Sequence, residues 1–178
     1  MRTAALLAVL FAALLPAAQM DKPPVTRAAL IPIEKRIDAR LGRPAQEEPY
    51  DLLGNTRAVY LEGFGVVFTT EVGLLQLPPI TPFNPSFSKE EIQKIHQRKA
   101  AKLPMLKQAM REMLAASAAS LTTLSADDQI AIAVTLFYFS WEDRTGLPSQ
   151  ILMQASKKSL AGKPLNDAPS ASIRLQEF

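Results

Sequence analysis

The chain has 178 residues, 48% of them hydrophobic, with no cysteine and a single histidine. The lack of cysteine excludes disulfides, thiolate nucleophiles, cysteine zinc sites and lipid attachment to an N-terminal cysteine. With 20 basic and 17 acidic residues, the chain is close to neutral, so we expect no nucleic-acid partner.

The first twenty residues are typical of a secretory signal. Arg2 supplies a positive charge, Ala4 to Leu15 form an unbroken apolar run, and small residues follow. The run is too short for a permanent membrane anchor, and no later stretch reaches eighteen consecutive apolar residues. We therefore predict a signal peptide over 1–18 and one domain over 19–178 with a mobile N-terminal leader. The product is expected in the bacterial periplasm or outside the cell, and not membrane-spanning after cleavage.

A first helix is predicted over residues 27–41. One face of it is apolar because four residues recur at helical spacing: Leu30, Ile33, Ile37 and Leu41. Thr26 caps its start, and Gly42 and Pro44 end it. Pro32 interrupts the early part, which allows the firm helix to begin at that proline.

Residues 42–56 read as a loop, and residues 57–72 have the aromatic and β-branched composition of strands. Gly63 and Gly65 lie in the middle of this second stretch. We favour two β segments around the glycines, and a bend in one long strand is the alternative. The proline-rich residues 77–85 are expected to be extended.

The clearest helix begins at Ser88, where Ser88 and Glu91 form a capping box. An apolar stripe continues to Leu121, and Pro104 within it predicts a kink or break near Leu103. The small residues over 115–120 allow a neighbouring element to pack closely.

The C-terminal third is predicted to be mainly strands. Residues 128–141 are almost wholly apolar and suit a central strand, with a buried helix as the competing interpretation. Residues 150–155 suit another strand, a short turn or helix follows to Gly162, and 172–178 suit an edge strand. The predicted fold class is α+β: a mainly antiparallel sheet of about four or five strands packed against one long helix and the N-terminal helix.

Most catalytic chemistry is missing from the sequence. His96 has no second histidine or cysteine with which to bind zinc, and no Gly-x-Ser-x-Gly motif accompanies it. There is no phosphate loop and no dinucleotide fingerprint. Met105, Met110 and Met113 suit copper(I), but the last two lie on the apolar stripe, where core packing is the better explanation. We predict no catalytic residues, no metal and no cofactor.

Carboxylates near the strands leave one enzymatic alternative. Glu62, Glu71, Glu142 and Asp143 are the acids in or beside these regions. Two of them brought within about 5–9 Å would suit acid–base hydrolysis, with Trp141 forming a ligand-binding lip. The alternative function is therefore a carboxylate-dependent hydrolase of unrecognised type. Solvated acids at turns and a packed tryptophan are the simpler interpretation.

The long helix carries the best interaction candidate. Between Lys89 and Arg111 there are seven basic residues and only two acidic ones. Lys94, Arg98 and Lys102 recur at every fourth position and share a face. Such a face suits an anionic envelope surface or an acidic envelope protein, although charge runs usually form the solvated side of an amphipathic helix.

Four segments together resemble a family of exported bacterial proteins with no known activity: residues 50–54, Tyr60–Phe68 (YLEGFGVVF), Ser140–Asp143 (SWED) and 147–150. The resemblance covers about residues 48–178. It implies export and a shared fold, and it supplies no functional residue. The leading functional expectation is a non-enzymatic accessory or binding module of the bacterial periplasm or cell envelope.

Overall fold

The structure is a computed structural model that describes residues 25–42, 48–77, 87–160 and 173–178. The predicted signal peptide and most of both the leader and the proline-rich segment lie outside these residues. In chain order, the elements are α1 (Arg27–Gly42), β1 (Asp51–Leu52), β2 (Arg57–Leu61), β3 (Gly65–Gly73), α2 (Lys89–Ser120), β4 (Gln129–Phe137), β5 (Gln150–Ser156), α3 (Lys157–Leu160) and β6 (Arg174–Glu177).

The strands form one sheet in the order β1-β3-β4-β5-β6, and β2 also pairs with β3, beyond β1 along that strand. Among the described strands only β3 and β4 pair in parallel, because the chain crosses back through α2 between them. The α+β class with a mainly antiparallel sheet is confirmed. The described residues form six strands, rather than four or five, because the two-residue β1 forms within the segment expected to be a loop.

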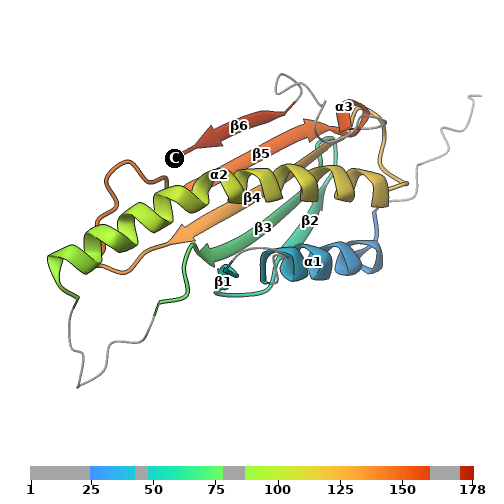
Figure 1. Ribbon diagram of the computed structural model, residues 1–178. Coiled ribbons are helices and arrows are strands. Elements are labelled where there is room, and N and C mark those ends of the chain that lie inside the picture. The colour runs from blue at the N-terminus through green and yellow to red at the C-terminus, as the bar shows by residue number, and fades with distance from the viewer. Residues whose placement is uncertain (1–24, 43–47, 78–86, 161–172) are drawn as a thin grey trace, which may run out of the picture.

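The two long helices cover one face of the sheet, as Figure 1 shows. Alternate residues of β3, β4 and β5 point to that face and are buried, which follows from the two-residue period of strands. They pack against the apolar stripes of α1 and α2 in one core. On the opposite face, Val59 and Leu61 of β2 are 49% and 45% exposed.

The strand predictions are confirmed in most respects. Residues 57–73 form two strands joined by a tight turn at Glu62–Phe64, and residues 129–137 form a strand in the middle of the sheet, not a helix. The predicted β5 and the edge strand β6 are also present. The backbone of Gly65 has φ of 131°, and a Cβ there would lie 2.0 Å from the carbonyl oxygen of Gln129. Glycine is required because β4 approaches the backbone of β3 at this point.

Both prolines inside helices are tolerated without interruption. The α1 helix begins at Arg27, before Pro32, and α2 runs through Pro104 as one helix of 32 residues. The predicted break near Leu103 is therefore absent, and the kink given as its alternative stays a prediction. Pro104 lies on the exposed side of α2, where solvent can satisfy the backbone carbonyl that proline leaves unbonded. The capping box is confirmed: Glu91 N–H donates to Ser88 Oγ at 3.2 Å, and Ser88 N–H donates to Glu91 Oε2 at 2.7 Å.

Candidate functional site

A groove between α1 and α2 contains two adjoining hollows, which we call the larger and the smaller hollow. The larger has a volume of about 380 Å³ and is lined by Arg40, Tyr50, Pro104, Met105, Gln108, Ala109 and Glu112. The smaller has a volume of about 120 Å³ and is lined by Ile33, Arg36, Ile37, Arg40, Glu112, Met113, Ala116 and Ser117. Arg40 and Glu112 line both, so the hollows meet at this pair.

Arg40 and Glu112 form an ion pair that joins the two helices. Arg40 Nε and Nη2 donate to Glu112 Oε2 at 3.2 and 2.9 Å, and Gln108 Nε2 donates to Glu112 Oε1 at 3.3 Å. Both side chains of the ion pair remain more than a third exposed. One turn along α1, Arg36 Nη1 donates to Ser120 Oγ at 2.8 Å. Two arginine contacts one helical turn apart thus bridge the helices beside the smaller hollow.

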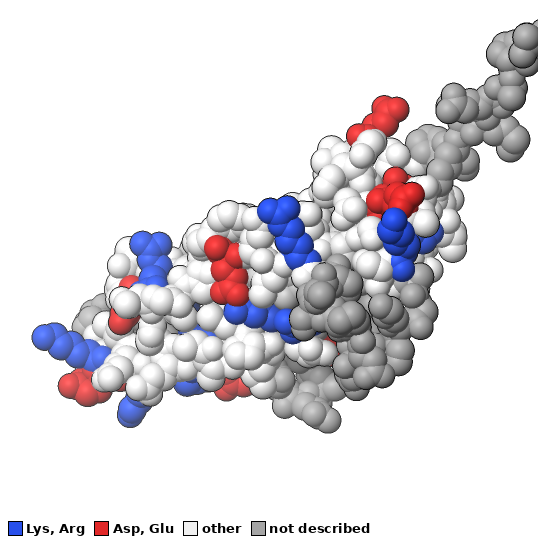
Figure 2. All heavy atoms as spheres, turned by 90° about the horizontal axis from the view of Figure 1, so that it is seen from above, with Lys and Arg blue, Asp and Glu red and all other residues white. Residues whose placement is uncertain are grey.

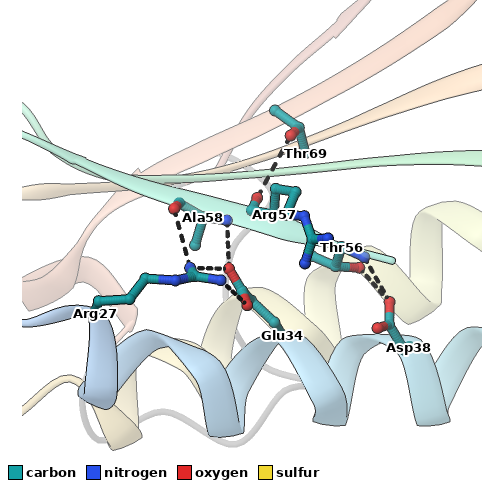
Figure 3. A network of polar contacts seen from close by, with 7 residues as sticks. All are labelled: Arg27, Glu34, Asp38, Thr56, Arg57, Ala58 and Thr69. Carbon is teal, nitrogen blue, oxygen red and sulfur yellow. Dashed lines mark hydrogen bonds and ion pairs between the residues drawn. The ribbon is translucent and has the colours of Figure 1, made fainter. Parts of the chain in front are cut away.

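The α1 wall of the groove is fixed to the sheet by the polar network in Figure 3. Glu34 accepts hydrogen bonds from Arg27 and from the N–H of Ala58, the latter at 2.6 Å. Asp38 accepts from the N–H and the hydroxyl of Thr56 at 2.9 and 2.6 Å. Because Glu34 and Asp38 are one turn apart, they fix both the position and the rotation of α1.

Burial by itself would raise the pKa of Glu34. The hydrogen bonds from Arg27 and Ala58, together with the charges of Arg27 and Arg57, outweigh that effect and hold the pKa below its usual value. Glu34 is therefore a buried carboxylate with its charge compensated, which suits a structural role.

The opposite end of the larger hollow is shaped by contacts to the segment after α1. Lys102 Nζ donates to the backbone carbonyl of Glu48 and lies 5.0 Å from the centre of the Tyr50 ring. Arg98 Nη2 donates to both carboxylate oxygens of Glu48 at 2.9 and 2.8 Å. These contacts hold Tyr50 against α2, where its ring forms one side of the larger hollow.

The three cations predicted to share a binding face therefore differ in their surroundings. Lys94 is exposed, Arg98 is exposed but paired with Glu48, and Lys102 is only 8% exposed. On the face seen in Figure 2, basic side chains lie among acidic ones and form no continuous basic patch over the described atoms. Two of the three cations thus serve contacts within the molecule.

Glu142, one of the predicted acids, is part of a buried ion pair. Lys99 Nζ donates to its carboxylate, both side chains are 2% exposed, and the N–H of Phe139 donates to the other carboxylate oxygen at 3.0 Å. Lys99 Nζ also lies 4.9 Å from the centre of the Tyr138 ring. Burial, and then the charge of Glu142, raises the pKa of Tyr138 to about 12. This cluster holds the segment after β4 against α2.

Two of the predicted acids, Glu62 and Glu142, lie far apart. Glu62 lies in the turn before β3, and Glu142 follows β4. Since β3 and β4 are parallel and in register from Gly65 opposite Gln129 to Gly73 opposite Phe137, these two acids lie at opposite ends of the sheet. At about 3.3 Å per residue, nine paired positions separate those ends by roughly 26 Å. Glu71 is exposed on the open face, and Trp141 stacks on Phe87 and Phe139.

The remaining candidates also have structural surroundings. His96 Nδ1 lies 3.1 Å from the carbonyl oxygen of Asp143. Met110 and Met113 are buried in the core, whereas Met105 is 40% exposed and lines the larger hollow. Within the described ranges, no three acidic or histidine side chains gather as metal ligands. The same part of the chain includes no helix long and apolar enough to cross a bilayer.

Sequence reasoning found the walls of the groove but not the groove. The apolar stripe of α1 and the small residues over 115–120 were both recognised. The sequence did not show that α1 is the element that packs against residues 115–120. It also did not show that Ala116 and Ser117 are too small to fill the space beside α1. The spacing of Arg36 and Arg40, one turn apart beside Ile33 and Ile37, was the available signal.

Comparison with family models, curated proteins and solved structures finds no match to this chain.

Proposed function

We propose that this protein is an exported, non-enzymatic binding module of the bacterial periplasm or cell envelope, and that its ligand occupies the groove between α1 and α2. The observation that carries the proposal is the pair of adjoining hollows that meet at Arg40 and Glu112. Export is supported by the N-terminal signal pattern and by the resemblance of four segments to exported bacterial proteins.

The groove has the properties of a small-ligand site. Such sites are concave, usually about 300–1,000 Å³, and combine apolar walls with a few converging polar groups. Here the polar groups are Arg40, Gln108 and Glu112, and the apolar walls come from both helices. Tethers from α1 to β2 and from α2 to the segment around Tyr50 hold the walls in place, so little ordering is needed when a ligand binds.

The groove supports a binding role better than the helix face does. A face of three cations would attract anionic surfaces, but Lys102 is directed into the molecule and Arg98 is neutralised by Glu48. Lys94 alone supplies too little charge for stable attraction to an anionic surface, since each basic residue contributes only about 1 kcal/mol there. An anionic envelope surface or an acidic envelope protein is therefore the second choice for a partner.

The proposal is tested by screening amino acids, short peptides, sugars and amphiphiles for a rise in the melting temperature of the purified protein. Ala116→Leu places a larger side chain in the smaller hollow, while Ala119→Leu makes the same change at an exposed position on the same helix. We expect a ligand whose binding is lost in the first variant and kept in the second.

Two results would overturn this proposal. One is a ligand whose affinity is the same in the wild type and both variants. The other is binding to anionic vesicles that Ala116→Leu retains and that Lys94→Gln with Arg98→Gln abolishes, because this would place the site on the helix face. Export is tested separately by cell fractionation, where an uncleaved protein in the cytoplasm contradicts it.

A further inference from the structure

We infer that the groove binds a free α-amino acid with a branched aliphatic side chain, an inference that rests on the proposed function. The larger hollow takes the ammonium and carboxylate groups beside Arg40 and Glu112, and the smaller hollow takes the side chain. Charge complementarity at the ion pair and the volume and lining of the smaller hollow carry this assignment.

Among the described residues, the ion pair leaves spare hydrogen-bonding capacity on one carboxylate oxygen and on one guanidinium nitrogen. Glu112 Oε2 accepts both bonds from Arg40, so Gln108, at 3.3 Å, is the one described residue that donates to Glu112 Oε1. On the other side, Arg40 Nη1 makes no hydrogen bond to any described residue. A guanidinium has five N–H donors, and a carboxylate accepts several hydrogen bonds. A cation beside Glu112 Oε1 and an anion beside Arg40 Nη1 would therefore both be stabilised.

An α-amino acid carries these two charges on groups joined by a single carbon. Arg40 Nη2 and Glu112 Oε2 are 2.9 Å apart, so the two protein charges are also adjacent. The ligand can lie alongside the intact ion pair with each of its charges next to the opposite charge. Binding in this way keeps the bond between α1 and α2 and adds two charge-assisted hydrogen bonds.

The smaller hollow fits an aliphatic side chain. Its volume is about 120 Å³, and Ile33, Ile37, Met113 and Ala116 supply most of its apolar lining. An apolar cavity of about 150 Å³ in another protein binds benzene, so this hollow suits a group of about four carbons. A leucine side chain placed there would contact both helices.

Other ligand classes fit the pair less well. A fatty acid satisfies Arg40 but brings a negative charge next to Glu112, and an alkylamine has the reverse mismatch. A sugar satisfies neither charge fully and leaves the apolar hollow empty. An internal peptide segment carries no charge on its backbone, so it too leaves the ion pair unmatched.

Isothermal titration of the full chain with L-leucine tests the assignment. Matched ligands separate the contributions: 4-methylpentanoate lacks the ammonium group, 3-methylbutylamine lacks the carboxylate, and L-alanine lacks most of the side chain. We expect leucine to bind, each single-charge analogue to bind at least about tenfold more weakly, and alanine roughly 50-fold more weakly because three buried carbons are lost.

Two protein variants and one control variant complete the test. Glu112→Gln removes the ammonium partner and should weaken leucine at least about tenfold, while the exposed Glu90→Gln on the same helix should leave the affinity unchanged. Ala116→Leu should abolish binding, with circular dichroism checking that each variant is folded.

No heat of binding at millimolar leucine overturns the assignment, and so does equal affinity for leucine and 4-methylpentanoate. If peptides or other compounds bind in a manner sensitive to Ala116→Leu but leucine does not, the ligand class is wrong and the groove remains the site. If no compound responds to Ala116→Leu, the proposed function itself fails.

Discussion

Lys99 and Glu142 form an ion pair whose two side chains are each only 2% exposed, and this pair joins the N-terminal third of α2 to the segment after β4. Two charges this deeply buried must satisfy each other, because transfer of an unpaired charge out of water is strongly unfavourable. The contact also lies beside the Tyr138 ring. This ion pair therefore holds the segment that contains Trp141 against α2.

Removing one partner of this buried pair should be strongly destabilising. Glu142→Gln leaves the Lys99 ammonium buried without its counterion, and the expected loss is about 3–5 kcal/mol in the free energy of unfolding. The double variant Lys99→Met with Glu142→Leu should recover much of that loss. Urea unfolding followed by circular dichroism measures both. The exposed pair of Lys158 and Asp127 is the control: Asp127→Asn should leave the midpoint unchanged. A double variant no more stable than Glu142→Gln would contradict this account.

Two lysines of one helix stripe should respond differently to the same substitution. Lys102→Gln removes a buried contact to the Glu48 carbonyl and the contact to the Tyr50 ring, so we expect a loss of about 1–3 kcal/mol in stability. Lys94→Gln changes an exposed side chain and should cost less than about 0.5 kcal/mol. Thermal unfolding of the two variants side by side checks the difference. Equal losses would mean that Lys102 is not held as described.

Gly65 should tolerate no side chain. In Gly65→Ala the new Cβ would lie 2.0 Å from the Gln129 carbonyl oxygen, at a backbone φ of 131°. The pairing of β3 with β4 would have to shift, and we expect a loss of at least about 3 kcal/mol in stability. Gly54→Ala is the matched control, since a Cβ there meets nothing within 4 Å. Chemical denaturation of both proteins provides the comparison, and similar midpoints would refute the close approach.

The carboxylate of Glu34 should make stability depend on acid pH. Its pKa in the folded protein lies below the usual value, so the unfolded chain binds the proton first as the pH falls. The stabilisation is thus complete above the unfolded pKa of about 4.3 and disappears as the pH falls through the lower folded pKa. Glu34→Gln should cost about 2 kcal/mol at pH 7, and its deficit relative to the wild type should shrink below about pH 4. The exposed Glu71→Gln should show no such trend in urea unfolding across this range.

The hydroxyl of Tyr138 should ionise at a higher pH than an exposed tyrosine, and the charge of Glu142 should contribute to this shift. Its pKa of about 12 is raised by burial and by the charge of Glu142. The unfolded tyrosine ionises near 10, so its contribution to stability is constant below about pH 10 and is lost as the pH rises above it. Absorbance at 295 nm, compared with Tyr138→Phe, isolates this group. In Glu142→Gln the pKa should fall but stay above 10, because burial remains; an unchanged value would contradict the role of the charge.

Local patterns predicted the elements of this fold well, because their causes are local. The capping box at Ser88 and Glu91 depends on residues three apart, and the turn at Gly63 and Gly65 depends on backbone conformations that glycine adopts most readily. The central position of β4 followed from its continuous apolar sequence. The sequence did not predict that α2 continues through Pro104, because this depends on which side of the helix faces solvent.

The candidate site was less accessible to sequence reasoning because its partners are distant in the chain. Arg40 and Glu112 are 72 positions apart, and nothing near either residue indicates the other. The basic stripe of α2 was recognised, but the inward direction of Lys102 depends on Glu48 and Tyr50 arriving beside it. A hollow also forms where the side chains of two helices leave space between them, and the periodicity of apolar residues does not reveal such a space.

The parallel pairing of β3 with β4 has a consequence for how the molecule assembles. These two central strands meet only after the whole of α2 has been placed between them in the chain, so the centre of the sheet depends on a contact between distant segments. Pairings of this kind are slow to form because the loop must close before any contact is gained. A fragment ending before β4 would leave one hydrogen-bonding edge of β3 without its partner strand. We therefore expect the described elements to fold together in one cooperative step, and we expect that neither the part before β4 nor the part after α2 is stable alone.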